Sequence, residues 1–161
     1  MKRFLLCITA LSGLLLFGCR TTTPRNYLKT LSAAELADLA GNGLAEDFRV
    51  ADADYLTDYV NLPQSGYSLS IRIAGGGDCI DEYGVLKSDI GTEEAARLLR
   101  EYLARSYEQN RTFYDSYIPA ETPKLRDAEV RIYGDYAVYA ILSPEEKDAF
   151  FNRVEQCLSE S

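Results

Sequence analysis

The chain has 161 residues, of which 47% are hydrophobic and 26% charged, a composition typical of one ordinary globular domain. It contains no His, which excludes Ser-His-Asp and Cys-His catalysis and every His-ligated metal site. Its 25 acidic side chains outnumber its 17 basic ones, and the net charge of −8 argues against a nucleic-acid groove, which needs clustered Lys and Arg.

Residues 1–18 have the pattern of a bacterial lipoprotein signal peptide. Met1-Lys2-Arg3 is a positive start, and Phe4–Phe17 is an almost unbroken apolar run that is too short to span a membrane. Gly18 before Cys19 closes the run and resembles a lipobox. This resemblance implies cleavage before Cys19, a diacylglycerol on its sulfur, and location at the extracytoplasmic face of the cytoplasmic membrane. A secretory signal peptide that is cut elsewhere is the alternative.

Residues 19–31 are expected to form a linker from the lipid anchor, because Thr21–Pro24 is polar and ends in Pro. Every charge before Ser32 is basic, so residues 32–161 carry the remaining 12 basic and all 25 acidic side chains. We expect 32–161 to be a single extracytoplasmic domain with a net charge of −13. The basic linker suits an anionic lipid surface, and simple solvation of its charges is the alternative.

The first half of this domain predicts one helix and two strands. Ser32 and Glu35 have the spacing of a capping box and mark the start of a helix. Residues 44–66 remain ambiguous. Tyr67–Ile73 alternates apolar and polar residues, as a half-buried strand does, whereas Glu82–Lys87 is apolar on both faces and predicts a central strand.

The second half predicts a long helix, a hairpin and a last helix. Thr92 is expected to cap a helix that runs to Gln109, with an apolar stripe on one side. Glu129–Tyr133 and Tyr136–Leu142 form the arms of a hairpin, the first typical of an edge strand and the second of a central strand. Ser143-Pro144-Glu145-Glu146 is a second capping box.

These elements follow the order αββαββα. Two hairpins separated by a helix predict the α+β class, with a mainly antiparallel four-stranded sheet and helices packed on one face.

Cys79 and Cys157 are the two cysteines of the domain. Outside the cytoplasm a disulfide between them would persist, and two buried thiols are the alternative. Their spacing matches no CxxC redox or metal motif.

The segment from Asp81 to Leu158 resembles the bacterial lipoprotein family known as domain of unknown function 4358. The similarity rests on Asp81–Lys87, the long helix, Tyr117-Ile118-Pro119 and Gly134–Val138. It implies a surface lipoprotein of a Gram-positive bacterium and implies no activity. The pattern of the family does not include the two cysteines.

Several acidic residues are candidates for chemistry. Asp52, Asp54 and Asp58 invite comparison with a calcium loop, but Leu56, Thr57 and Pro63 stand where an EF-hand needs other residues, so an irregular cation site or a solvated acidic surface remains. Asp78, Asp81 and Glu82 offer paired carboxylates for acid–base work on a sugar, although an acidic protein contains such pairs by chance. The glycines at 75–77 indicate a flexible turn rather than a phosphate loop.

Tyr is the unusual residue of this chain, with 12 copies. If Tyr133 lies on an outward face with Glu129 and Arg131, this face is a candidate interaction surface, because Tyr is enriched at interfaces. The alternative is that these rings cover the sheet.

Two functions remain open. The first is a non-catalytic, lipid-anchored interaction domain whose partner is another surface protein or a basic peptide. The second is a ligand-sensing domain or a carboxylate-based enzyme that acts on cell-wall material. We expect no cofactor, no metal and no nucleic acid in either case.

Overall fold

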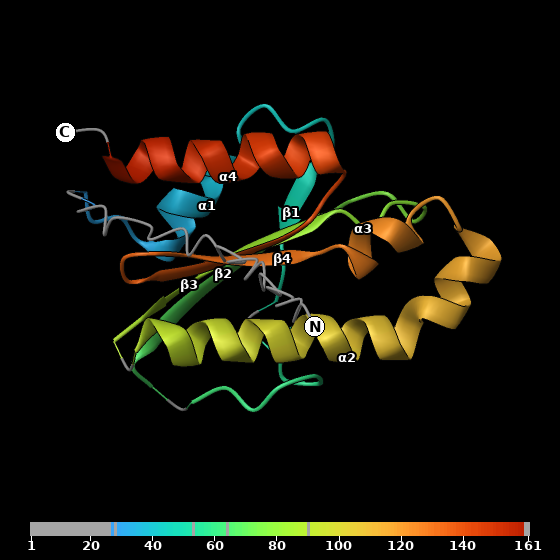
Figure 1. The fold of residues 1–161 in the computed structure, drawn as a ribbon, viewed down its shortest axis with the longest axis horizontal. Coiled ribbons are helices and arrows are strands. Elements are labelled where there is room, and N and C mark those ends of the chain that lie inside the picture. The colour runs from blue at the N-terminus through green and yellow to red at the C-terminus, as the bar shows by residue number, and fades with distance from the viewer. Residues whose placement is uncertain (1–26, 28, 53, 64, 90, 160–161) are drawn as a thin grey trace, which may run out of the picture.

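The computed structural model describes residues 27, 29–52, 54–63, 65–89 and 91–159 (Figure 1). The chain order of the elements is α1 (Ala33–Gly41), β1 (Phe48–Val50), β2 (Tyr67–Ala74), β3 (Glu82–Ser88), α2 (Thr92–Tyr117), α3 (Thr122–Arg126), β4 (Glu129–Tyr133), β5 (Tyr136–Ile141) and α4 (Pro144–Ser159). All the strands join one antiparallel sheet, so the predicted α+β class is confirmed.

The sheet has five strands rather than the predicted four, in the spatial order β1-β2-β3-β5-β4. The additional strand is β1, whose three residues pair with the C-terminal end of β2. Its brevity explains why the sequence does not predict it, since three residues are too few to establish an alternating pattern. The central positions of β3 and β5 and the edge position of β4 agree with the prediction.

Helices cover both faces of the sheet, so the prediction of one covered face is wrong. Figure 1 shows α1 and α4 together on one side of the strands and α2 on the other, and the packing contacts agree. The physical reason lies in the central strands. Every residue of β5 and nearly every residue of β3 is buried, and a sheet that is apolar on both faces needs a cover on each.

Each face therefore has its own core. The core between the sheet and α1/α4 contains aromatic side chains from β3, β4, β5 and α4, namely Tyr83, Tyr133, Tyr136, Phe150 and Phe151. The core between the sheet and α2 contains the predicted apolar stripe of that helix, including Leu98, Leu99, Tyr102 and Leu103. Leu56 and Val60, from the segment between β1 and β2, complete this second core.

Two of the three predicted helix caps are confirmed. Ser32 Oγ accepts a bond from Glu35 N–H at 3.2 Å, and the Glu35 carboxylate accepts one from Ser32 N–H at 2.8 Å. At the start of α4, Ser143 Oγ accepts a bond from Glu146 N–H at 3.4 Å and donates its hydroxyl to the Glu146 carboxylate at 2.7 Å.

The long helix α2 begins at Thr92 as predicted, but the predicted cap by the Thr92 hydroxyl is wrong. Gly91 occupies the N-cap of α2, and Thr92 instead donates its hydroxyl to the carbonyl of Gly134 at 3.0 Å. The helix also continues to Tyr117, beyond the predicted end at Gln109.

The chain enters the domain at the end of the sheet that carries the β4–β5 turn. The backbone of Leu31 donates to and accepts from the hydroxyl of Tyr136, at 2.8 and 2.7 Å. Lys87 Nζ donates to the same carbonyl at 3.1 Å. Tyr27 packs edge-on against Tyr133, with ring centroids 5.9 Å apart. The last residues of the predicted linker therefore pack against the core.

Candidate functional site

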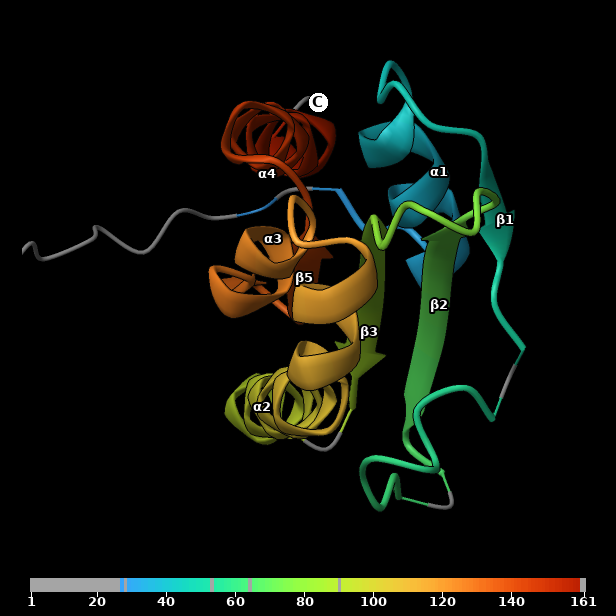
Figure 2. The ribbon, with the colours of Figure 1, turned by 90° about the vertical axis from the view of Figure 1, so that its right-hand side faces the viewer.

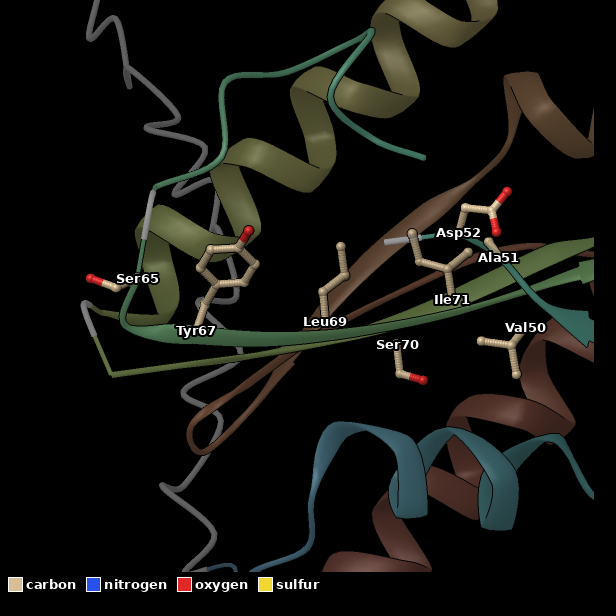
Figure 3. A pocket seen from close by; sticks show the side chains of 8 residues that line it. All are labelled: Val50, Ala51, Asp52, Ser65, Tyr67, Leu69, Ser70 and Ile71. Carbon is tan, nitrogen blue, oxygen red and sulfur yellow. The ribbon is translucent and has the colours of Figure 1, made fainter. Parts of the chain in front are cut away.

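A pocket of about 310 Å³ lies beside the N-terminal half of β2 (Figure 3). Leu69 and Ile71 project from one face of the strand and Ser70 from the other, as Figure 3 shows. The residues that line the pocket are Val50, Ala51, Asp52, Ser65, Tyr67, Leu69, Ser70 and Ile71. The pocket therefore follows the edge of a strand and combines apolar side chains with one carboxylate.

This part of the sheet edge has no partner strand within the described part of the chain. β1 pairs with β2 only from Arg72 to Ala74, and one further bond joins Ala51 N–H to the carbonyl of Ile71 at 3.1 Å. Because hydrogen-bonding direction alternates along a strand, the backbone N–H and C=O groups of Tyr67 and Leu69 point to the same side as that carbonyl. Among the described residues, no strand pairs with them there.

The path of the chain explains the open edge. Figure 2 shows β1 beside the C-terminal half of β2 and the following segment running away from the strand before it returns to start β2. An unpaired row of backbone donors and acceptors is a template for an added strand, and peptide-binding domains use this geometry.

Acidic side chains flank the open edge. Asp52 lines the pocket, and Asp54 and Asp58 are exposed in the turns that follow. No Lys or Arg is among the lining residues. Arg72, farther along β2, is buried and paired with Asp38 at 2.6 Å. The electrostatic potential along this edge therefore favours a positively charged partner.

A second concentration of polar groups surrounds the carboxyl group of Glu82, which is 5% exposed. Tyr102 donates its hydroxyl to Oε1 at 2.6 Å, and Tyr139 donates to the same oxygen. Tyr55 donates to Oε2 at 2.8 Å. Burial raises the pKa of Glu82, and these three hydroxyl donors oppose that effect. Burial and the nearby carboxylate also raise the pKa of each of the three tyrosines, which keeps the hydroxyls protonated.

Three elements bring this cluster together. Tyr102 belongs to the buried stripe of α2, Tyr139 to the central strand β5, and Tyr55 to the segment between β1 and β2. The ring of Tyr139 lies against Gly84, which pairs with it across β3 and β5. A Cβ at Gly84 would stand 3.0 Å from Cζ of that ring, so only glycine leaves room for the tyrosine.

A pocket of about 210 Å³ opens next to this cluster. Its aromatic wall consists of Tyr55, Phe113 and Tyr114, and its polar lining includes Asp81 and Glu82. The remaining lining residues are Ile73, Ala74, Gly77, Cys79, Ile80 and Ile118. The pocket therefore combines aromatic rings with carboxyl groups and contains no basic lining residue.

Asp81 is already neutralised by a lysine. Lys124 Nζ donates to Asp81 at 2.6 Å and to Glu121 at 2.9 Å. Cys79, Asp81 and Glu121 place one potential metal ligand each within 4.8 Å of one another, the only such group among the described residues. The ammonium of Lys124 occupies the position between the two carboxylates, so the arrangement is an ion-paired cluster. Burial raises the pKa of the Cys79 thiol to about 11, which leaves it neutral near pH 7.

The other predicted carboxylate groups are not brought together. Asp78 is exposed, whereas Asp81 bonds to Lys124 and Glu82 to the tyrosines, so the three do not form the acid–base pair that we considered. Asp52, Asp54 and Asp58 likewise do not converge as ligands among the described residues. Asp52 lines the pocket beside β2, and Asp54 and Asp58 are exposed in the turns that follow it.

The predicted interaction surface of Glu129, Arg131 and Tyr133 required Tyr133 to face outward, and this condition is not met because Tyr133 packs against α4. Tyr133 is 6% exposed and donates its hydroxyl to the carbonyl of Phe151 at 3.3 Å. The guanidinium of Arg131 lies 4.1 Å from the centre of the Phe151 ring and pairs with Glu129 at 2.7 Å. Tyr133 is thus turned toward α4, whereas the side chains of Arg131 and Glu129 remain 38% and 43% exposed.

Two of the three cysteines singled out in the sequence, Cys79 and Cys157, lie in the described part of the structure. Cys79 lies at the pocket near Glu82, whereas Cys157 packs against the core between the sheet and α1/α4. Both belong to the described part of the chain, and no disulfide joins them. The lipidation site Cys19 lies outside the described residues.

Sequence reasoning missed both the tyrosine cluster and the open edge. The sequence does contain one indication of the cluster, since Glu82 opens an otherwise apolar central strand in a chain rich in Tyr. A buried acid in such a strand requires donors, and tyrosine hydroxyls are the neutral donors available. No comparable pattern marks the edge, because it depends on where β1 ends.

The chain matches no family model, no curated protein and no solved structure. Its resemblance to domain of unknown function 4358 therefore remains an expectation from the sequence. Within the described residues, no helix has the length and apolar character needed to cross a bilayer.

Proposed function

We propose that this chain is a lipid-anchored extracytoplasmic protein whose domain binds an extended, positively charged segment of another protein. The observation that carries this proposal is the unpaired edge of β2 at Tyr67 and Leu69, which lies beside a pocket. A bound segment would continue the line of β1 and use these backbone groups as partners. The lipobox pattern at Cys19 supports the membrane anchor.

Charge supports a basic partner. The domain carries 12 basic and 25 acidic side chains from residue 32 onward, and Asp52 lines the pocket itself. Such a field accelerates the encounter with a cationic segment and repels anionic wall polymers. The apolar side chains of Leu69 and Ile71 would contact the aliphatic residues of the same segment.

Binding fits the described geometry better than acid–base catalysis on cell-wall material. An acid–base enzyme needs a free acid and a free base in one cleft. Asp81 is held by Lys124, and Glu82 accepts bonds from three tyrosine hydroxyls. Within the described part of the chain, both carboxyl groups are therefore already engaged by other side chains.

A pair of peptides tests the proposal. The probe is a short fluorescent peptide of alternating Lys and Val, and its matched control carries N-methyl groups on alternate backbone nitrogens. Both have the same charge, but only the first can pair along a sheet edge. We expect the unmodified peptide to raise the fluorescence anisotropy in a saturable manner and to bind about ten-fold or more tightly than the methylated one, with weaker binding in high salt.

Two charge variants locate the contact. Asp52→Asn removes a carboxylate from the pocket, and Asp115→Asn removes one from the exposed side of α2. We expect only Asp52→Asn to weaken binding of the Lys-Val peptide. Equal binding of the two peptides, or equal effects of the two variants, would show that the acidic surface attracts cations without strand addition.

A further inference from the structure

We propose that the pocket beside Glu82 binds a primary ammonium ion carried on a short aliphatic arm. This site is separate from the β2 edge and does not depend on the proposed function. Its volume of about 210 Å³ is below that of a typical drug-sized site but sufficient for an amine with a few carbon atoms. Tyr55, Phe113 and Tyr114 supply the aromatic wall.

The hydrogen bonds of Glu82 leave room for one more donor. Each carboxylate oxygen accepts about two hydrogen bonds. Oε1 already accepts from Tyr102 and Tyr139, whereas Oε2 accepts from Tyr55 alone among the described residues. The remaining acceptor position therefore belongs to Oε2. Tyr55, which donates to this oxygen, lines the pocket together with Glu82. An ammonium N–H would complete the set.

The charge around this acceptor also favours a cation. All three described donors to Glu82 are neutral hydroxyls, and the neighbouring Lys124 is bonded to Asp81 and Glu121. The pKa of Glu82 is raised by burial, and an adjacent ammonium would stabilise the ionised form that burial disfavours. No counter-ion within the described residues already fills that role.

The C-terminal end of α2, which lies beside the pocket, also favours a cation. Phe113 and Tyr114, in the last turns of α2, and Ile118, just after it, line the pocket. The C-terminal end of a helix carries partial negative charge, and the last turn of α2 contains no basic residue to offset it. An ammonium beside these aromatic side chains would also gain cation–π attraction wherever it meets a ring face.

Three probes separate charge from hydrogen bonding. Calorimetric titrations of the full chain would use n-butylammonium, the neutral n-butanol, and tetramethylammonium, which has no N–H. We expect n-butylammonium to bind about ten-fold or more tightly than n-butanol, with tetramethylammonium between them. Equal affinity for n-butanol would overturn the assignment of a cation site. Equal affinity for tetramethylammonium would overturn the assignment of the Oε2 acceptor.

The same ammonium chemistry occurs in free amines and in lysine side chains. Titration with Nα-acetyl-lysine amide distinguishes these two sources. Binding as tight as that of n-butylammonium would indicate that a lysine of a partner enters the pocket. Loss of binding would assign the site to a free amine.

Two variants test the residues. Glu82→Gln removes the charge, and Phe113→Ala removes a ring that is 56% exposed and therefore carries little of the core. The controls are Glu94→Gln and Leu39→Ala, which remove an acid and an apolar side chain at other exposed positions. We expect both test variants to weaken n-butylammonium binding and both controls to leave it unchanged. Unaltered binding to Phe113→Ala would contradict the site even if Glu82→Gln does not fold.

Discussion

Glu82 carries a carboxyl group that folding moves from water into the boundary between β3, β5 and α2. Removing an ionised carboxyl group from water costs free energy unless hydrogen bonds replace those of the solvent. Three tyrosine hydroxyls make that replacement here. The net effect still disfavours the charged form, because burial raises the pKa of Glu82. The contribution of Glu82 to the stability of the domain should therefore depend on pH.

We expect the free energy of unfolding of the wild-type chain to fall, relative to that of Glu82→Gln, as the pH rises above the ordinary glutamate pKa of 4.5. In that window the unfolded chain releases the proton of Glu82 while the folded protein retains it, so rising pH favours unfolding. Below 4.5 both states are protonated and the difference should be constant. Urea denaturation of both proteins across a pH series measures this difference.

Glu94→Gln is the control of opposite sign. Glu94 is exposed, and its hydrogen bond from Arg97 lowers its pKa. Its contribution to stability should therefore be present at neutral pH and be lost as the pH falls. If the difference between wild type and Glu82→Gln instead increased with pH, the tyrosine hydroxyls would outweigh the burial of Glu82.

For individual residues, the sequence predicted which side chains are buried better than it predicted which side chains touch one another. The spacing of Tyr102 on its helix correctly indicated a core position, and Glu82 was correctly assigned to a central strand. That these two side chains meet, and that Tyr55 joins them, depends on how α2 and the segment after β1 lie on the sheet. A periodic pattern reports which face of an element is buried but not which residue of another element it touches.

At the scale of elements, local patterns specified the ends of some helices. The capping box at Ser32 involves residues only three positions apart, so it forms as the sequence predicts. The hairpin between β4 and β5 is similarly local, with Tyr133 opposite Tyr136 and Gly134 at a φ of 57°, a conformation that glycine adopts readily. In contrast, Gly91 rather than Thr92 caps α2, because the Thr92 hydroxyl has a partner in a distant turn.

Replacing Ser32 by Ala should lower the free energy of unfolding by about 1 kcal/mol, because the N–H of Glu35 loses its acceptor at the start of α1. The helix has only nine residues, so its first turn is a large part of it. Denaturant unfolding measures the change. Ser116→Ala, the same substitution on the exposed surface of α2, should change the free energy by less than about 0.5 kcal/mol. Equal effects of the two variants would mean that the capping box does not stabilise the domain.

The arrangement of the helices was not predicted, although the strands contained the necessary information. The two central strands were correctly identified as apolar on both faces, and such strands require helices on both sides. The same oversight affected the candidate interaction surface. With α4 on this side of β4, Tyr133 bonds to the carbonyl of Phe151 and Arg131 lies over the Phe151 ring, so Tyr133 does not face outward.

At the scale of the whole molecule, the two ends of the sheet have different surroundings. Leu31, where the chain enters, bonds to Lys87 and Tyr136, which pair with each other at one end of β3 and β5. Glu82 pairs with Ile141 at the other end of the same strands. The pocket beside Glu82 therefore lies at the end of the sheet opposite the entry of the chain.

The anchor itself is testable. We expect the wild-type chain to partition into the detergent phase of a Triton X-114 extraction and Cys19→Ser to remain in the aqueous phase. The physical reason is that two or more acyl chains hold a protein stably on a bilayer, whereas the three basic residues of the linker, Arg20, Arg25 and Lys29, contribute at most about 1 kcal/mol each near anionic lipid.

Cys7→Ser is the matched control, because Cys7 lies within the segment that cleavage before Cys19 would remove. This variant should partition as the wild type does, and mass spectrometry of both should show a mature chain that begins at a diacylglycerol-modified Cys19. Detergent partitioning of Cys19→Ser would instead mean that the apolar run of Phe4–Phe17 is retained and itself holds the membrane. The domain would then be displayed by an uncleaved signal sequence, and the acyl chains would not be needed to keep its acidic surface at the bilayer.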